Sequence, residues 1–298
     1  MLTFSIILPT YRRPEVLMEA LERLARQTIG SRTLEILLID DGPSPECEAL
    51  AIRFSNSFHS LKYIPQDNEG QSKARNRGVA LAEAEFLFFM GDDILLEPDV
   101  LERHKAFHDR SPHHNVAVFG KIAIDPRLEN DPFIHWLNNG GPQNNLSALK
   151  EGYVTPDLIE TAHLSIRKEY ASKIAFDERL RYFENYLWVH GLFQTGFLFY
   201  YLPSAIAYHY HPSDPAKYGR RMYGIGKTIA LLARENHPLF KEMSRNQRPL
   251  KRFSLWRYRV MGLWLGNKKY LHKYWRMILN NRQYEGYRDF IRSEDQHR

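Results

Sequence analysis

The feature that most constrains the fold is the alternation of short apolar runs with longer amphipathic stretches over the first hundred residues. The apolar runs have the length of strands and predict four of them, over residues 4–8, 34–39, 61–64 and 85–90. The stretches between them predict helices over residues 14–27, 45–56 and 71–82. This order is typical of β-α-β units, so we expect an α/β fold with a mostly parallel sheet flanked by helices.

Polar or turn-forming residues follow each predicted strand. In an open parallel sheet, ligands bind beyond the carboxyl ends of the strands. We therefore expect one site to form from four loops, at residues 9–12, 40–43, 68–70 and 91–93.

Two of these loops carry acidic pairs. Asp92 and Asp93 follow a continuously apolar strand, and adjacent carboxylates repel each other unless solvent or a cation intervenes. Mg²⁺ or Mn²⁺ is held by one or two carboxylates in many sites, although a solvated turn is the simpler alternative for this pair. Asp40 and Asp41 repeat the arrangement, and such carboxylates also accept hydrogen bonds from a base or from ribose hydroxyls.

The other two loops bring a ring and a group of cations. Tyr11 offers a surface on which a pyrimidine could stack, with half-buried packing as the alternative. Lys73, Arg75 and Arg77 lie near the start of a predicted helix, where free backbone amides and the helix dipole favour a diphosphate. A solvated charged face is the alternative there. The glycine spacing matches neither a P-loop nor a dinucleotide-binding fingerprint.

The rest of the chain is less regular. Residues 125–155 are rich in Asn, Gly and Pro and predict a long surface excursion. Strands are expected at 163–166, 197–201 and 206–210, a helix at 185–195, and helices from residue 216 onward, broken near 266–267 and 280–281. We expect one domain over residues 1–215 and a helical extension over residues 216–298.

The extension carries the positive charge. Residues 241–298 hold 15 Lys and Arg against 5 Asp and Glu, whereas residues 1–240 hold 26 against 30. Aromatic residues are interleaved with these cations, among them Trp256, Trp264 and Trp275. This composition suits a helix at a lipid surface, and helices packed on the main domain are the alternative. No recognised nucleic-acid-binding motif accompanies the charge, so we expect no nucleic-acid partner.

Cysteine usage and hydropathy bear on the compartment. The single cysteine, Cys47, excludes an internal disulfide and favours a reducing compartment. No run approaches the roughly 18 to 20 apolar residues of a membrane-spanning helix, and the first run is too short for a signal peptide. We expect a cytoplasmic protein, on the inner face of the membrane if the tail binds lipid.

Taken in order, four segments resemble the family 2 glycosyltransferases: residues 5–14, 35–42, 68–78 and 88–93. Residues 176–180, 183–185 and 203–205, followed by His209 and His211, are similar to the second half of that family. The resemblance implies a GT-A fold and transfer of a sugar, with inversion, from a nucleotide-diphosphate donor to a carbohydrate or lipid-linked acceptor. UDP is the commonest nucleotide in the family, and envelope or surface polysaccharide or glycolipid synthesis is the implied setting.

The resemblance also implies roles for individual residues. It assigns the donor nucleotide and sugar to a set of loop residues: Pro9, Tyr11, Asp40, Asp41, Asn68, Lys73, Arg75 and Asp92. It assigns a divalent metal, Mn²⁺ or Mg²⁺, to Asp93 and His209, with His211 as second choice. Met90 and Gly91 stand where the family has an earlier aspartate, so we expect a weaker metal site.

The catalytic base is the largest departure from the family pattern. The position of the usual aspartate is held by Asn185, and an amide does not accept a proton usefully at neutral pH. We expect the adjacent Glu184 to act as the base, with Asp177 or Glu178 as alternatives and a helix-start carboxylate as the structural explanation for Glu184. A binding protein without catalysis and a nucleotidyltransferase remain alternative functions.

Overall fold

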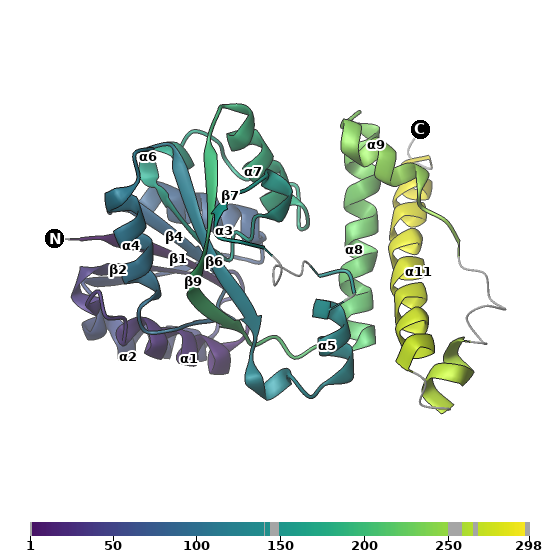
Figure 1. The fold of residues 1–298 in the computed structure, drawn as a ribbon, viewed down its shortest axis with the longest axis horizontal. Coiled ribbons are helices and arrows are strands. Elements are labelled where there is room, and N and C mark those ends of the chain that lie inside the picture. The colour runs from purple at the N-terminus through teal and green to yellow at the C-terminus, as the bar shows by residue number, and fades with distance from the viewer. Residues whose placement is uncertain (1, 140, 144–148, 250–257, 265–267, 296–298) are drawn as a thin grey trace. The chain divides into compact units, whose positions relative to one another are not determined.

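The structure is a computed structural model that describes residues 2–139, 141–143, 149–249, 258–264 and 268–295 (Figure 1). Two compact units are present. The first comprises Met1–Leu128, Leu146–Leu180 and Glu184–His211, and the second comprises Glu129–Asn145, Arg181–Phe183 and Pro212–Arg298. The domain boundary expected at residue 215 stays a prediction.

A nine-stranded sheet forms the centre of the first unit, in the order β3-β2-β1-β4-β8-β6-β9-β5 with β7 paired to β9. Strands β3, β2, β1 and β4 are parallel, as expected for β-α-β units. The four strands predicted in this region are confirmed to within two residues at each end. The strand bounds are β1 Phe4–Thr10, β2 Leu34–Asp40, β3 Ser60–Pro65, β4 Phe86–Met90, β5 Ile94–Leu96, β6 Val116–Ile124, β7 Gly152–Tyr153, β8 His163–Arg167 and β9 Leu198–His209.

Local signals explain where the helices begin. Pro14 opens the first helix with its φ already fixed, and Ser44 accepts a hydrogen bond from the Cys47 amide at 3.2 Å as the cap of the second. The helices of this unit are α1 Pro14–Ala25, α2 Pro45–Phe54, α3 Gln71–Leu81, α4 Val100–Arg110, α6 Lys168–Ala171 and α7 Glu184–Gln194, with short 3₁₀ turns η1 Ser31–Thr33, η2 Ser55–Ser57, η3 Pro126–Leu128 and η4 Pro156–Leu158.

The sheet has a buried layer on each face, because alternate residues of a strand point to opposite sides. On β1, Phe4, Ile6 and Leu8 pack in one cluster with buried side chains of α1, α2 and α4. Ile7 packs in a second cluster with buried side chains of α3 and α7. Burial on both faces explains why these strands read as continuous apolar runs.

Two predictions for the middle and late chain are corrected. Residues 125–155 are not one surface excursion but contain η3, the helix α5 Pro132–Asn139 and β7. The helix forms because it has a buried apolar face, made by Phe133, Ile134, Trp136 and Leu137. The strands expected at 197–201 and 206–210 are one strand, β9, whose register against β6 shifts at Gly120 and Lys121.

The second unit is helical. Its helices are α5, α8 Pro215–Arg234, α9 Pro238–Arg245, the π-helix η5 Val260–Trp264 and α11 Lys268–Asp295, and α8 and α11 run side by side (Figure 1). The prediction of a helix break at residues 280–281 is wrong, because α11 continues through these residues. The predicted break at 266–267 and the side chains of Trp256 and Trp264 lie outside the described residues. Trp275 is 7% exposed and contacts the rings of Phe133 and Trp136 at 5.2 and 5.5 Å, so it belongs to a core and not to a lipid-facing surface.

Helix α3 approaches the sheet closely at Gly78. A Cβ atom at this position would lie 2.6 Å from Cγ2 of Ile7, whereas one at Gly191 in α7 would lie 3.4 Å from Cδ1 of Ile174, an ordinary contact. We therefore expect Gly78→Ala to lower the free energy of unfolding by about 1–3 kcal/mol, because an added methyl group overpacks the core.

The matched control is Gly191→Ala, for which we expect no loss, or a gain of about 0.5–1 kcal/mol from helix propensity. Urea unfolding of both variants measures the difference. Equal stabilities for the two would show that α3 does not need the close approach.

Candidate functional site

Strand pairing brings the acidic pair Asp92 and Asp93 close to two histidines. After β4 the chain turns at residues 91–93 and forms β5, which pairs antiparallel with the end of β9 so that Ile94 lies opposite His209. The Tyr210 amide donates to the Asp93 carbonyl at 2.9 Å and extends this pairing by one bond. Asp93 and His209, which are more than a hundred positions apart in the sequence, are thereby held side by side at the carboxyl edge of β4.

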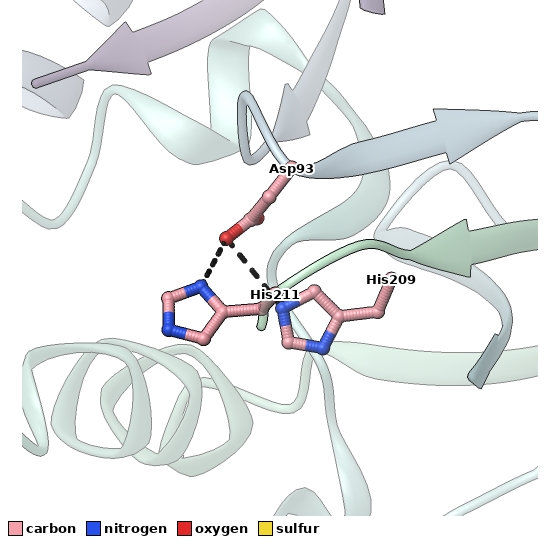
Figure 2. Close-up of side chains that lie close together, drawn as sticks. All are labelled: Asp93, His209 and His211. Carbon is pink, nitrogen blue, oxygen red and sulfur yellow. Dashed lines mark hydrogen bonds and ion pairs between the residues drawn. The ribbon is translucent and has the colours of Figure 1, made fainter. Parts of the chain in front are cut away.

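Asp93, His209 and His211 form a compact group of potential metal ligands (Figure 2). Asp93 Oδ2 lies 2.9 Å from His211 Nδ1 and 3.5 Å from His209 Nε2, and the ligand atoms all lie within 4.8 Å of one another. Burial alone would raise the pKa of Asp93, but hydrogen bonds from both histidines and the charge of Arg13 hold it well below its usual value. The carboxylate is therefore ionised, as a metal ligand must be.

This donor set fits a divalent ion. One carboxylate oxygen and two imidazole nitrogens suit a transition ion such as Mn²⁺ better than Mg²⁺, which prefers an all-oxygen shell. His209 and His211 are two residues apart, which places both side chains on one face of an extended chain, and both rings reach Asp93. His211, only the second choice from the sequence, is the nearer of the two.

Asp92 is fully buried beside this group. It accepts hydrogen bonds from Thr10 Oγ1 at 2.7 Å and from Arg13 Nε at 3.2 Å, and Arg13 Nη2 also donates to it. Burial raises the pKa of Asp92 to about 6, with Arg13 opposing the shift and Asp93 adding to it. Both oxygens of Asp92 thus have protein partners.

The acidic pair at the end of β2 organises the neighbouring loops. Asp40 is fully buried and accepts from the Gly42 amide at 3.2 Å and from the Tyr63 hydroxyl at 2.9 Å. Asp41 accepts from the amides of Glu69 and Gly70 at 2.6 and 3.0 Å, which lie just before α3. These bonds hold the loop after β3 against the loop after β2.

The remaining nucleotide-site residues lie around these loops. Pro9 is buried in β1, and Tyr11 follows that strand with 40% of its surface exposed. A Cβ atom on Gly42 would lie 2.6 Å from the Tyr11 ring, so the absence of a side chain there lets the ring lie over the turn. Asn68 has a positive φ of 46°, and its amide donates to the Asp41 carbonyl at 2.9 Å.

Two cations of α3 have different surroundings. Lys73 is half-buried and forms an ion pair with Glu69. Arg75 is 2% exposed, with Nη1 3.2 Å from Glu184 Oε1 and 2.6 Å from Asn185 Oδ1. The predicted base Glu184 is therefore a buried partner of Arg75 at the start of α7, and the roles of both residues toward a ligand stay predictions.

The sequence interpretation missed Arg13, Thr10 and Gln66. Arg13 bridges Asp92 and Asp93, and Gln66 Nε2 donates to Asp41 at 2.7 Å. Two adjacent buried carboxylates need a cation, and Arg13 lies in the loop between β1 and α1. That combination was the signal that could have identified Arg13. A separate cavity of about 520 Å³ lies between α4 and the β7–β9 pair and is lined by none of the predicted site residues.

Comparison with known proteins bears on the family and on the fold. The profile of glycosyl transferase family 2 matches residues 5–174, more than half of the chain. The chain belongs to glycosyl transferase family 2. Its fold is of the GT-A type, an α/β fold in which helices flank a mixed sheet, with a helical carboxyl-terminal part. The predicted fold class and the predicted family are both confirmed.

Relatives within the family include the minor teichoic acid biosynthesis protein GgaB of Bacillus subtilis, 28% identical over 60% of this chain. A glycosyltransferase of PGL/p-HBAD biosynthesis in Mycobacterium tuberculosis is 41% identical over 35% of this chain. The matched segments span only 19% and 41% of those two proteins.

Solved structures of similar fold have lower identity. Staphylococcus aureus TarS 1–349 in complex with UDP-GlcNAc is 18% identical, with a TM-score of 0.59 over 100% of this chain and 93% of that one. The mannosyltransferase PcManGT of Pyrobaculum calidifontis, in complex with GDP-Man and Mn²⁺, is 16% identical, with a TM-score of 0.64 over 94% and 85%. At these identities the likeness concerns the fold. No helix among the described residues is long and apolar enough to cross a bilayer.

The buried pair of Arg75 and Glu184 makes a stability prediction. Arg75→Met leaves the Glu184 charge buried without its partner, so we expect a loss of about 3–5 kcal/mol in the free energy of unfolding. The double variant Arg75→Met/Glu184→Leu removes both charges and should recover most of the loss. Chemical denaturation checks both, and a fully stable Arg75→Met protein would mean that the guanidinium is not needed for folding.

Proposed function

We propose that this family member transfers a sugar, with inversion, from a nucleotide-diphosphate donor to an acceptor hydroxyl, with the help of a divalent metal. The observation that carries the proposal is the Asp93, His209 and His211 group at the carboxyl edge of the sheet. Structures of similar fold hold UDP-GlcNAc in one case and GDP-Man with Mn²⁺ in another, which supports a nucleotide-sugar donor, and we propose a UDP-sugar.

The donor is bound by loop residues in this proposal. The exposed ring of Tyr11 stacks on the base, while Asp41 holds the loop after β3 in place. Asp93 and His209, joined by His211, hold the ion, which when bound neutralises the negative charge of the departing nucleoside diphosphate. The side chain of Lys73 is 43% exposed, and its ammonium is available to the same diphosphate once it leaves Glu69.

Glu184 is proposed as the general base. The acceptor hydroxyl oxygen attacks the anomeric carbon from the side opposite the diphosphate, the bond to the diphosphate breaks, and the hydroxyl proton passes to the carboxylate. Arg75 fixes the position of Glu184 through the contact at 3.2 Å. A positioned base is pre-oriented for the reaction, which lowers the entropic part of the barrier.

An amide substitution tests this assignment. We expect Glu184→Gln to lower kcat by about 10²- to 10⁴-fold with little change in the affinity for UDP, because general-base help is lost while donor contacts remain. The comparison variant is Glu178→Gln, which changes a carboxylate that hydrogen-bonds Asn76 at 2.9 Å. UDP release with a UDP-sugar and an acceptor is the measurement, and a loss confined to Glu178→Gln would move the role to Glu178.

A second candidate function, donor binding without transfer, is favoured by Asn185 alone. It predicts that UDP binds the parent protein but that no acceptor is glycosylated, and that Asn185→Asp creates activity. A nucleotidyltransferase would release pyrophosphate from a nucleoside triphosphate, so a pyrophosphate-release assay with a nucleoside triphosphate, run beside the UDP-release assay, separates the three functions.

We propose synthesis of an envelope or surface polysaccharide or glycolipid as the biological setting, in the cytoplasm at the membrane surface. The names of the teichoic acid and PGL/p-HBAD relatives support this setting. Lys269, Lys273 and Arg276 are exposed and lie three and four residues apart on α11, which places them on one face. Such a face attracts anionic lipid headgroups.

Vesicle binding tests the proposed membrane contact. We expect the full chain to co-sediment with anionic vesicles, and the variant Lys269→Gln/Lys273→Gln/Arg276→Gln to lose most of this binding, since each cation near the surface contributes about 1 kcal/mol. Arg103→Gln/Lys105→Gln/Arg110→Gln on α4 removes the same charge elsewhere and serves as the control. Equal sedimentation of both variants would contradict a role for α11.

A further inference from the structure

We propose that Arg13 is a built-in counter-cation that competes with the divalent ion for Asp93. Binding of the ion then requires Arg13 Nη1 to leave Asp93, while the other nitrogens of the guanidinium stay on Asp92. This inference rests on the metal role proposed above for Asp93, His209 and His211, and it concerns a residue outside that group.

The guanidinium has two separable sets of contacts. Nε and Nη2 face Asp92, with Nε 3.2 Å from Oδ2 and Nη2 donating to Oδ1. Nη1 alone faces the metal-ligand group, 2.7 Å from Asp93 Oδ2 and 3.3 Å from His211 Nδ1. Because the forked side chain holds Asp92 with two nitrogens, it can give up Asp93 without losing its anchor.

The atoms that Nη1 contacts are the atoms an ion needs. Asp93 Oδ2 is the oxygen closest to both histidines, and His211 Nδ1 is the nitrogen that faces Asp93. Nδ1 lies within reach of a donor, Arg13 Nη1, and of an acceptor, Asp93 Oδ2, and one ring nitrogen cannot serve both in a single tautomer. An ion would use the lone pair of Nδ1 and that of Oδ2, so the guanidinium and the ion exclude each other at this point.

The position of Arg13 allows this exchange. It directly precedes the first residue of α1, and its carbonyl accepts from the Leu17 amide at 3.1 Å, so the backbone is fixed. The side chain is 38% exposed, whereas Asp92 and Asp93 are 0% and 12% exposed in their side chains. The cation can therefore move while the two carboxylates stay in place.

The charge balance gives the expected consequence. Without an ion, Arg13 offsets the repulsion between the adjacent buried carboxylates Asp92 and Asp93. An ion that binds must displace Arg13 from Asp93, and the cost of this displacement lowers the net free energy of ion binding. Substituting Arg13 by an uncharged residue should then strengthen ion binding and make the folded state depend more on the ion.

The test measures Mn²⁺ alone, without donor or acceptor. The dissociation constant is obtained by calorimetry for the parent chain, for Arg13→Met and for Arg12→Met. Arg12 is exposed and contacts the Tyr11 ring at 5.3 Å, so its loss removes the same charge from the neighbouring position without touching Asp92 or Asp93. We expect Arg13→Met to bind Mn²⁺ at least about tenfold more tightly, and to gain more thermal stability on Mn²⁺ addition than the parent, with Arg12→Met within about threefold of the parent.

The outcomes separate this inference from the proposed function. Unchanged or weaker Mn²⁺ affinity in Arg13→Met, with binding in the parent, overturns the inference and leaves the metal site standing. Absence of Mn²⁺ binding in both proteins overturns the proposed metal role and the inference together. If Arg13→Met does not fold, Arg13→Lys decides, because a single point charge cannot hold both carboxylates as the fork does: tighter binding than the parent supports the competition, and equal binding overturns it.

Discussion

The pairing of β5 with the end of β9 is the interaction on which the site depends. β5 is only three residues long, yet its backbone bonds place Ile94 opposite His209 and bring Asp93 to two histidines from a distant part of the chain. Because a shift of one residue in this register would turn the histidines to the other face, the geometry of the ligand group is specified by main-chain hydrogen bonds.

Buried charge is balanced locally throughout this edge of the sheet. Each buried carboxylate has its own partners: Arg13 for Asp92 and Asp93, backbone amides for Asp40 and Asp41, and Arg75 for Glu184. Such pairs contribute little net stability, because desolvation offsets their attraction, but losing one partner is costly. These contacts hold the edge in shape, which suits its proposed role in orienting a donor.

The sequence was sufficient for the strands and helices of the first ninety residues and for the position of the acidic loops, but β5 was not predicted. Strands buried on both faces give apolar runs that end where the loops begin, and proline marks two helix starts, so each signal is local. The partners of these loops were not predictable in the same way. Whether Arg75 meets a ligand or Glu184 depends on how α3 and α7 pack. Helix α5 was missed because its apolar face is short and is followed directly by a segment rich in glycine and asparagine.

The path of the chain has a consequence for engineering. The helical unit takes residues 129–145 and 181–183 from the middle of the sequence in addition to everything after residue 211, and α5 contributes Phe133 and Trp136 to its core around Trp275. The helical unit therefore cannot be removed or exchanged by cutting the chain at a single position. A chimaera that replaced only the carboxyl-terminal stretch would leave the grafted helices without their native counterpart, so a transplant has to carry all three pieces of chain.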